Sequence, residues 1–236
     1  MEFWTFFTAK PLLWLIVTIA TFIATSWFNR RVGGTPLLHP VLVSLSLIII
    51  FLLLTGTEYE TYFEGAQFIH FLLGPATVAL AVPLYDHLER VKKMILPLLV
   101  ACMAGAVAAA ASAILVAQAF DAQIGTLLSL APKSVTSPIA IGIAEKIGGY
   151  PSLASGLVLI TGAIGCILAP PLYRIMNVKD EAVKGFALGV SAHGMGTAFA
   201  FEYGLMAGAF GGLAMGMTGA FTAFMLPVLI SLLGIG

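Results

Sequence analysis

The sequence predicts an all-α polytopic membrane protein with about seven or eight transmembrane segments, at roughly 20 apolar residues per crossing. Its 236 residues are 60% hydrophobic and only 9% charged, whereas a soluble domain carries about 25% charged residues. The mean hydropathy is +1.04, and stretches without Asp, Glu, Lys or Arg recur along the whole chain. These observations exclude an ordinary soluble domain.

The first elements are two uncharged runs, 11–29 and 32–57, which we expect to form scaffold helices within an N-terminal region, 1–64. The first run lacks the short apolar core and small-residue cleavage site of a signal peptide, so we interpret it as a retained helix. A pair of arginines follows this run, and more basic residues follow the third. The positive-inside rule therefore places the N-terminus outside and residues 85–93 inside.

The remaining region, 65–236, is expected to be a transport-type core built around interrupted helices. Its three breakpoints lie near 74–75, 132–138 and 191–197, and each precedes a long uncharged run. This recurrence indicates an internal repeat, which we expect to be inverted, because broken helices in corresponding repeats are typical of transporter binding sites. The uncharged runs of this region are 65–85, 94–120, 122–132, 134–144, 147–173, 185–201 and 203–236.

The central break surrounds Lys133, which lies halfway between Asp121 and Glu145 with eleven uncharged residues on either side. Pro132 and Pro138 interrupt any helix there, because proline removes a backbone donor and disfavours the α conformation of its predecessor. Irregular backbone at membrane depth is tolerated only where protein or a wet cavity surrounds it. The distribution of basic residues favours a re-entrant hairpin over a discontinuous crossing helix, but both have the same local signature.

Lys133 is the first candidate for substrate binding, because a charge near the bilayer centre costs at least about 2.5 kcal/mol. Its ammonium can bind an anion together with the hydroxyls of Ser134, Thr136 and Ser137. A half-helix beginning at Ser137, with Pro138 in its first turn, would point free N–H groups at the same anion. The alternative is a lysine that pairs with a carboxylate or extends toward the membrane surface.

The third break centres on His193, beside Gly194 and Gly196, where the missing side chains let backbone segments approach closely. His193 and Thr197 are candidates for hydrogen bonding to substrate, and His193 for carrying a proton. The competing interpretation is a buried neutral histidine that bonds backbone carbonyls.

Three further residues complete the set of candidates. Glu202 is a candidate for proton coupling, a partner for Lys133, or an interfacial carboxylate with a supporting role. Gly74 and Pro75 form the first predicted helix break.

Small residues recur at every fourth position after the third break, a spacing typical of close helix packing in membranes. We interpret them as a packing seam, with a sliding or gating surface as the alternative. Either interpretation requires one helix to run through the region. The residues are Ala200, Gly204, Gly208, Gly212, Gly216 and Ala220.

Other functional classes lack support in the sequence. It contains no P-loop, no nucleophile elbow and no histidine pair at metal spacing, so we expect no enzyme activity, cofactor or metal. The net charge of zero argues against a nucleic-acid partner. Cys102 and Cys166 lie inside apolar runs, which argues against a structural disulfide.

Three motifs carry a family resemblance: PATVALAVPLY at 75–85, PKSVTSPIA at 132–140 and SAHGMGTA at 191–198. Together they resemble the LrgB/CidB family, over nearly the whole chain from Pro36 onward. The resemblance implies a bacterial inner-membrane protein linked to murein hydrolases and cell lysis, in a holin/antiholin-like scheme with a smaller membrane partner. It also implies kinship with the plastidal glycolate/glycerate translocators of plants. The short chain has no transit peptide and is expected to be the stand-alone bacterial form.

Two hypotheses for function follow. The first is a secondary transporter of small monocarboxylates such as glycolate, glycerate, lactate or pyruvate, with the anion bound at Lys133. The residues alone indicate only a small anion, and the resemblance implies a monocarboxylate. The alternative is a holin/antiholin-like oligomer that regulates murein hydrolase activity and cell lysis. In both cases we expect a multi-pass protein of the cell inner membrane that forms a homo-oligomer, such as a dimer.

Overall fold

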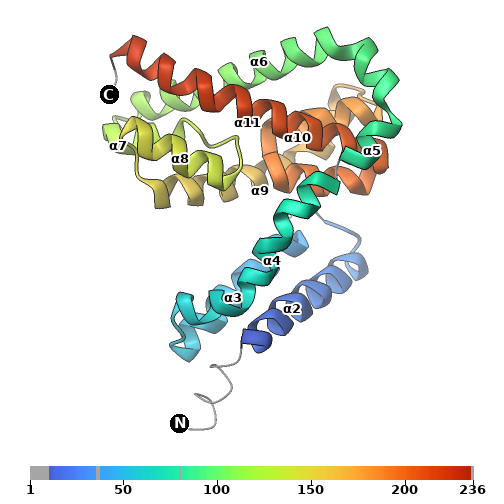
Figure 1. The fold of residues 1–236 in the computed structure, drawn as a ribbon, viewed down its shortest axis with the longest axis vertical. Coiled ribbons are helices and arrows are strands. Elements are labelled where there is room, and N and C mark those ends of the chain that lie inside the picture. The colour runs from blue at the N-terminus through green and yellow to red at the C-terminus, as the bar shows by residue number, and fades with distance from the viewer. Residues whose placement is uncertain (1–10, 36–37, 80, 235–236) are drawn as a thin grey trace. The chain divides into compact units, whose positions relative to one another are not determined.

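The computed structural model describes residues 11–35, 38–79 and 81–234, and within these ranges every regular element is a helix. The predicted all-α class is therefore confirmed. The chain divides into two compact units, Met1–Ala79 and Leu80–Gly236 (Figure 1). The predicted boundary after residue 64 falls inside the last helix of the first unit.

In the first unit one helix packs against the two others. Trp14, only 1% exposed, joins them, because its ring meets Phe51 and Tyr62 edge-on at centroid distances of 6.3 and 5.8 Å. Asn29 closes the first connection by donating to the carbonyl of Leu38 at 2.6 Å. The helices are α2 (Pro11–Arg31), α3 (Pro40–Thr55) and α4 (Tyr59–Ala79).

The first predicted break is not a break in the structure. Helix α4 continues through Gly74 and Pro75 and ends at Ala79. Proline within a membrane helix is tolerated where neighbouring groups satisfy the freed carbonyl. Gly74 and Pro75 therefore lie inside a helix.

The second unit combines three long helices with shorter, interrupted ones. Figure 1 shows α11 running across this unit, and it packs against α6, α8 and α10. The elements are α5 (Ala81–Asp86), α6 (Leu88–Ala119), α7 (Ile124–Leu130), α8 (Ser137–Ile147), α9 (Pro151–Ile175), α10 (Glu181–Ala200), the 3₁₀ turn η2 (Phe201–Tyr203) and α11 (Leu205–Leu233).

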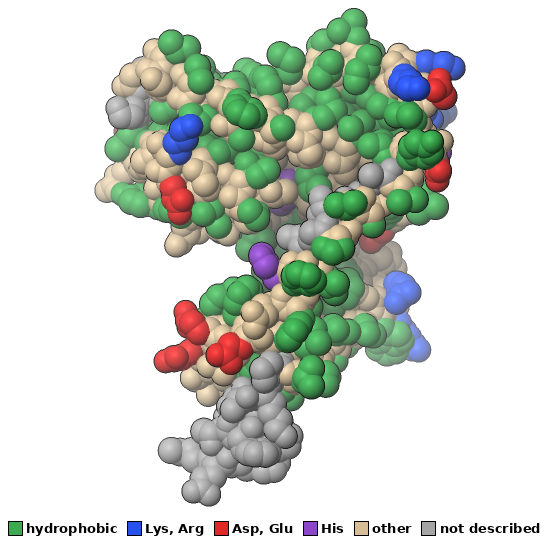
Figure 2. Space-filling view, in the orientation of Figure 1, with side chains coloured by type: hydrophobic (Ala, Val, Ile, Leu, Met, Phe, Trp, Pro, Cys, Tyr) green, Lys and Arg blue, Asp and Glu red, His purple; other side chains and the backbone are tan. Residues whose placement is uncertain are grey.

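Four helices of the described chain are long and apolar enough to cross a membrane. Their outer faces expose large apolar side chains, such as Ile160 (56%) and Phe224 (81%). Figure 2 shows hydrophobic side chains over most of the visible face, with the charged ones gathered in a few places. This surface suits lipid rather than water. The spans are Leu12–Arg31, Leu88–Ala119, Pro151–Ile175 and Leu205–Leu232, and Pro40–Thr55 is a shorter apolar helix.

Helix α10 consists of two arms that fold back on each other. The backbone leaves the helical region at Ala192 and His193, so the arms are residues 181–191 and 194–200. A Cβ on Gly196 would overlap with the carbonyl oxygen of Leu188, although eight residues of straight helix would separate the two by about 12 Å. The third break is therefore a re-entrant hairpin. The non-helical residues are Ala192 and His193, whereas Gly194 and Gly196, predicted as the break, lie in the returning arm.

The predicted seam of small residues does not lie on one helix. Gly204, with φ of +130°, turns the chain between η2 and α11. Gly208 packs on the Phe201 ring, whereas Gly216 and Ala220 are exposed. Gly189 on α10 packs instead against the carbonyl of Gly211 on α11. The close helix packing that the sequence predicts is present, but with different partners.

Candidate functional site

Helices α7 and α8 form the arms of a first hairpin, whose tip is residues 131–136. The chain after α8 returns to α7: Ser129 Oγ donates to the carbonyl of Gly125 at 2.6 Å and accepts the N–H of Tyr150 at 2.7 Å. The Tyr150 ring occupies the space where a Cβ on Gly125 would lie. The arms contain seven and eleven residues, far fewer than the roughly 20 needed to cross a bilayer. This geometry is the re-entrant hairpin that the basic residues favour.

Replacing Ser129 by alanine should loosen this hairpin. Ser129 is fully buried, and its loss would leave the Tyr150 N–H without its acceptor, which typically costs about 1–3 kcal/mol. We expect a lower midpoint of thermal unfolding in detergent, measured by size-exclusion chromatography after heating. Ser112→Ala is the control, because exposed Ser112 bonds only the carbonyl of Ala109 in its own helix. Equal midpoints for the two variants would contradict this role of Ser129.

Lys133 lies at the tip of the first hairpin and is half-buried. Its ammonium donates to Ser134 Oγ at 3.2 Å, and Ser134 is itself only 7% exposed. No carboxylate of the described residues lies within ion-pairing distance of Lys133. The carboxylate-pairing alternative thus finds no partner in this part of the chain, and the tip holds a cation beside a hydroxyl.

The returning arm α8 begins at this tip. Thr136 is its N-cap in extended conformation, and its side chain makes no capping hydrogen bond. Ser137, the predicted cap, is instead the first helical residue, followed by Pro138. The first N–H groups of a helix have no intrahelical acceptor. The hydroxyls of Thr136 and Ser137, both half-buried, therefore accompany a helix N-terminus that favours an anion.

His193 forms the tip of the second hairpin, in a left-handed conformation with φ 43° and ψ −128°. Its Nε2 lies 3.0 Å from the carbonyl oxygen of Val158 on α9, and the ring fills the space that a Cβ on Gly162 would need. Thr197 Oγ1 donates to the His193 carbonyl at 2.8 Å. Both side chains are buried. The geometry matches the competing interpretation of a histidine bonded to a backbone carbonyl, which rigidifies the tip.

Residues next to the two tips approach neighbouring turns of α11. Ile139, at the start of α8, reaches Gly219 of α11, while Gly194 of the second tip faces Met215. These α11 positions are four residues apart, about 6 Å along a helix. On α9, Val158 binds His193 and also belongs to the apolar cluster that contains Val135 of the first tip.

Each hairpin tip contains two helix ends whose dipoles have opposite signs. Each tip combines the carbonyl end of an incoming arm with the N–H end of a returning arm, so the helix dipoles partly cancel. The net charge of the site therefore comes from Lys133.

Glu202 is not part of the tips. It lies in η2 at the end of the returning arm and is exposed. The ring of its neighbour Tyr203 meets the Tyr173 ring edge-on, with 6.0 Å between the ring centroids. The Lys184 ammonium lies over the Tyr203 ring, 5.2 Å from its centroid. Glu202 therefore belongs to the base of the hairpin. Among residues 11–35, 38–79 and 81–234, no group of three His, Cys, Asp or Glu side chains could hold a metal.

The sequence did not predict which helices, α9 and α11, pack against the two tips. Gly162 on α9 leaves room for the His193 ring, and Gly219 on α11 leaves room for Ile139. The only signal is a glycine within a long apolar run, and it does not identify the partner. Contacts between distant segments decide which glycine matters.

Comparisons with known proteins point to one family. The LrgB-like family model matches residues 18–232. The uncharacterized protein YxaC of Bacillus subtilis (strain 168) is 35% identical over 92% of this chain and 94% of its own length. The antiholin-like protein LrgB of the same strain is 29% identical over 96% and 98%. The holin-like protein CidB of Staphylococcus epidermidis is 29% identical over 94% and 97%.

No solved structure matches the chain. The family match covers most of it, and the relatives align over nearly their whole lengths. The four apolar helices agree with membrane proteins of the holin-like and antiholin-like type. The chain is therefore a member of the LrgB-like family of membrane proteins.

Proposed function

We propose that this membrane protein carries small monocarboxylate anions, with the carboxylate bound between the two hairpin tips. One observation carries the proposal: the Lys133 ammonium lies at the tip of a re-entrant hairpin, beside a hydroxyl and without a carboxylate partner among the described residues. A cation held at a helix break is costly unless a ligand uses it. The substrate class is glycolate, glycerate, lactate or pyruvate.

We assign distinct roles to the tip residues in this proposal. Lys133 would bind the carboxylate together with the N–H groups at the start of α8. Ser134, Thr136 and Ser137 offer hydroxyls for a 2-hydroxy or 2-oxo group. The hydrogen bond of His193 to Val158 gives the second tip a positioning role, and Thr197 bonds the backbone of the same tip.

The second candidate function is that of a holin-like or antiholin-like protein acting on membrane integrity and cell lysis. The similarity to relatives named antiholin-like protein LrgB and holin-like protein CidB favours it. It would act as an oligomer with a small membrane partner, and α11 offers an exposed face at Gly216 and Ala220 for assembly. Gly208, against the Phe201 ring, serves the fold instead.

For either function we place the protein in the cell inner membrane as a multi-pass homo-oligomer with the N-terminus outside. Most basic residues of the second unit then face the cytoplasm, in agreement with the positive-inside rule.

One experiment separates the two functions. Purified protein is reconstituted into liposomes with a trapped fluorescent dye, and entry of labelled glycolate and of labelled pyruvate is measured. We expect saturable uptake of at least one of them, competed by the unlabelled acid, while the dye stays inside. Dye release, or uptake that never saturates, would favour the holin-like function. Protein-free liposomes control for passive entry of the protonated acid.

A further inference from the structure

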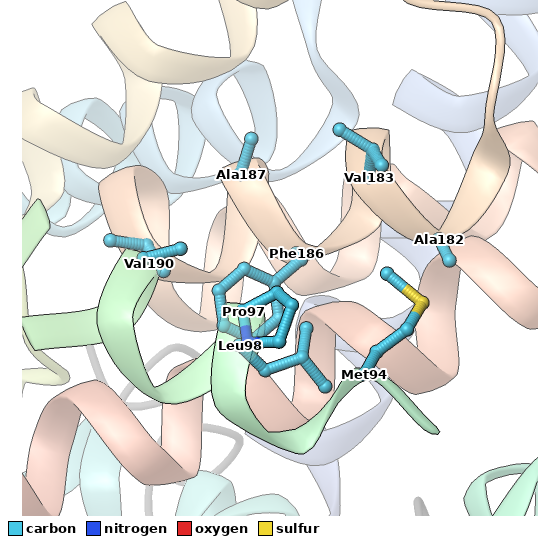
Figure 3. Close-up of a pocket in the computed structure, with 9 residues that line it drawn as sticks. Met94, Pro97, Leu98, Ala182, Val183, Phe186, Ala187 and Val190 are labelled. Carbon is cyan, nitrogen blue, oxygen red and sulfur yellow. The ribbon is translucent and has the colours of Figure 1, made fainter. Parts of the chain in front are cut away.

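A groove of about 410 Å³ lies between α6 and the first arm of α10. Its floor is apolar and buried: Leu98 is 4% and Phe186 6% exposed. In Figure 3 the Phe186 side chain points toward Pro97 and Leu98, and the Met94 side chain reaches toward Ala182. The rim residues Pro97, Ala101, Val183 and Ala187 are exposed.

The groove is long enough for part of a lipid acyl chain. It follows α6 from Met94 to Ala101, which is about 10 Å along a helix axis. Helix α6 is one of the four candidate spans, so the groove opens on a surface that faces hydrocarbon. Its lining carries almost no polar surface, which excludes a small polar metabolite as its occupant.

Basic side chains lie near the Met94 end of the groove, and some of them form no ion pair with the described residues. Arg90 pairs with Asp180, which also caps α10 by accepting the N–H of Ala182 at 2.8 Å. Exposed Lys93 lies one turn before Pro97 on α6, and exposed Lys179 lies in the connection directly before Asp180, the N-cap of α10. Neither lysine forms an ion pair within the described chain.

Among the described residues, no carboxylate at this end forms an ion pair with Lys93 or Lys179. Glu89 pairs with Lys92, and Asp86 ends the preceding helix α5. Glu181 points toward Gly204, where its Oε2 lies 2.9 Å from the position of a Cβ. Lys93 and Lys179 are thus available to a negative group at the mouth of the groove.

We propose that this groove binds one acyl chain of an anionic phospholipid whose phosphate is held by Lys93 and Lys179. Basic residues at the polar end of a crevice between membrane helices are typical of sites for anionic headgroups. The apolar lining accepts the chain, and the two lysines select the headgroup. The proposal is independent of the carboxylate site, because it uses none of the tip residues.

Native mass spectrometry of the full-length protein in detergent tests this proposal. Wild-type protein is titrated with phosphatidylglycerol and, separately, with phosphatidylcholine of the same acyl chains. One variant, Ala187→Phe, fills the groove, and another, Lys93→Gln with Lys179→Gln, removes its free cations. Ala220→Phe, on the exposed face of α11, and Lys146→Gln, at the exposed end of α8, are the matched controls.

We expect wild-type protein to retain phosphatidylglycerol at least fivefold better than phosphatidylcholine. Both groove variants should lose this preference, and both controls should keep it. Equal retention of the two lipids, or undiminished retention of phosphatidylglycerol by Ala187→Phe, would overturn the proposal. A changed dimer fraction in Ala187→Phe with unchanged lipid retention would assign the groove to a second copy of the chain instead.

Discussion

Lys133→Met should strongly weaken saturable carboxylate uptake into liposomes while the protein remains folded. The substitution keeps most of the side-chain length but removes the charge, and a hydrogen bond to a charged group contributes about 1.5–3 kcal/mol. With tenfold per 1.4 kcal/mol, the apparent affinity should fall by about 10- to 100-fold. The fold should persist, because no carboxylate of the described chain would be left unpaired.

The control for this prediction is Lys146→Met. Lys146 is exposed in the last turn of α8, so the same change in net charge occurs at the opposite end of the same arm. Both variants should elute from a size-exclusion column like wild type, and only Lys133→Met should show weakened uptake. Wild-type uptake in Lys133→Met would remove Lys133 from the site and leave the holin-like function as the better account.

The first hairpin could be predicted from sequence because its causes are local. Pro132 and Pro138 disfavour a continuous helix, because each removes a backbone donor and restricts the residue before it. Lys133 adds a charge that hydrocarbon does not tolerate. The structure accordingly ends one helix at Leu130 and begins the next at Ser137. Only the contact of Ser129 with Tyr150, which closes the hairpin, required the structure.

The second hairpin could be predicted only in part, because its causes are long-range. No proline marks residues 192–193, and the sequence indicates a weak point there without a direction for the chain. The reversal depends on Gly196 lying against Leu188 and on the His193 ring fitting between Val158 and Gly162. A non-glycine residue in a left-handed conformation persists only where its surroundings hold it.

The first predicted break shows the opposite error. Gly74 and Pro75 resemble a helix end by the same local rule, yet α4 continues through them. A proline costs a membrane helix only one hydrogen bond and a steric adjustment. Neighbouring groups can compensate for that loss within the membrane. A single proline is therefore a weaker signal than the two that flank Lys133 with hydroxyls between them.

The small residues after His193 pack differently from the prediction, because the sequence did not indicate the turn at Gly204. The small residues at every fourth position from Ala200 to Ala220 predict one continuous packing seam on a helix. Gly204 interrupts this seam, because the chain turns there. Glycines on the first arm of α10 then meet α11 in a parallel arrangement: Gly185 lies against Ala207 and Gly189 against Gly211. The residue type was informative, whereas the pairing depended on the turn.

Gly185→Ala should destabilise the protein more than any other conservative glycine change on these two helices. A Cβ at this position would overlap with the backbone carbonyl oxygen of Ala207, which cannot move without shifting α11. Overpacking in a well-packed core typically costs about 1–3 kcal/mol, and a clash with backbone lies at the upper end. Intrinsic helix propensity favours the alanine by only about 1 kcal/mol. The expected result is a much lower unfolding midpoint in detergent, with less folded protein recovered.

Gly216→Ala is the matched control, because it makes the same change on the partner helix α11. No atom lies within 4 Å of the position of its Cβ, so only the gain in helix propensity remains, and the midpoint should rise slightly. The same glycine-to-alanine change should therefore lower the unfolding midpoint at position 185 and raise it at position 216. A stable Gly185→Ala variant would show that α10 and α11 can separate without loss of the fold. A large loss of oligomer in Gly216→Ala, with the protomer still folded, would instead assign the exposed face of α11 to assembly, in support of the holin-like function.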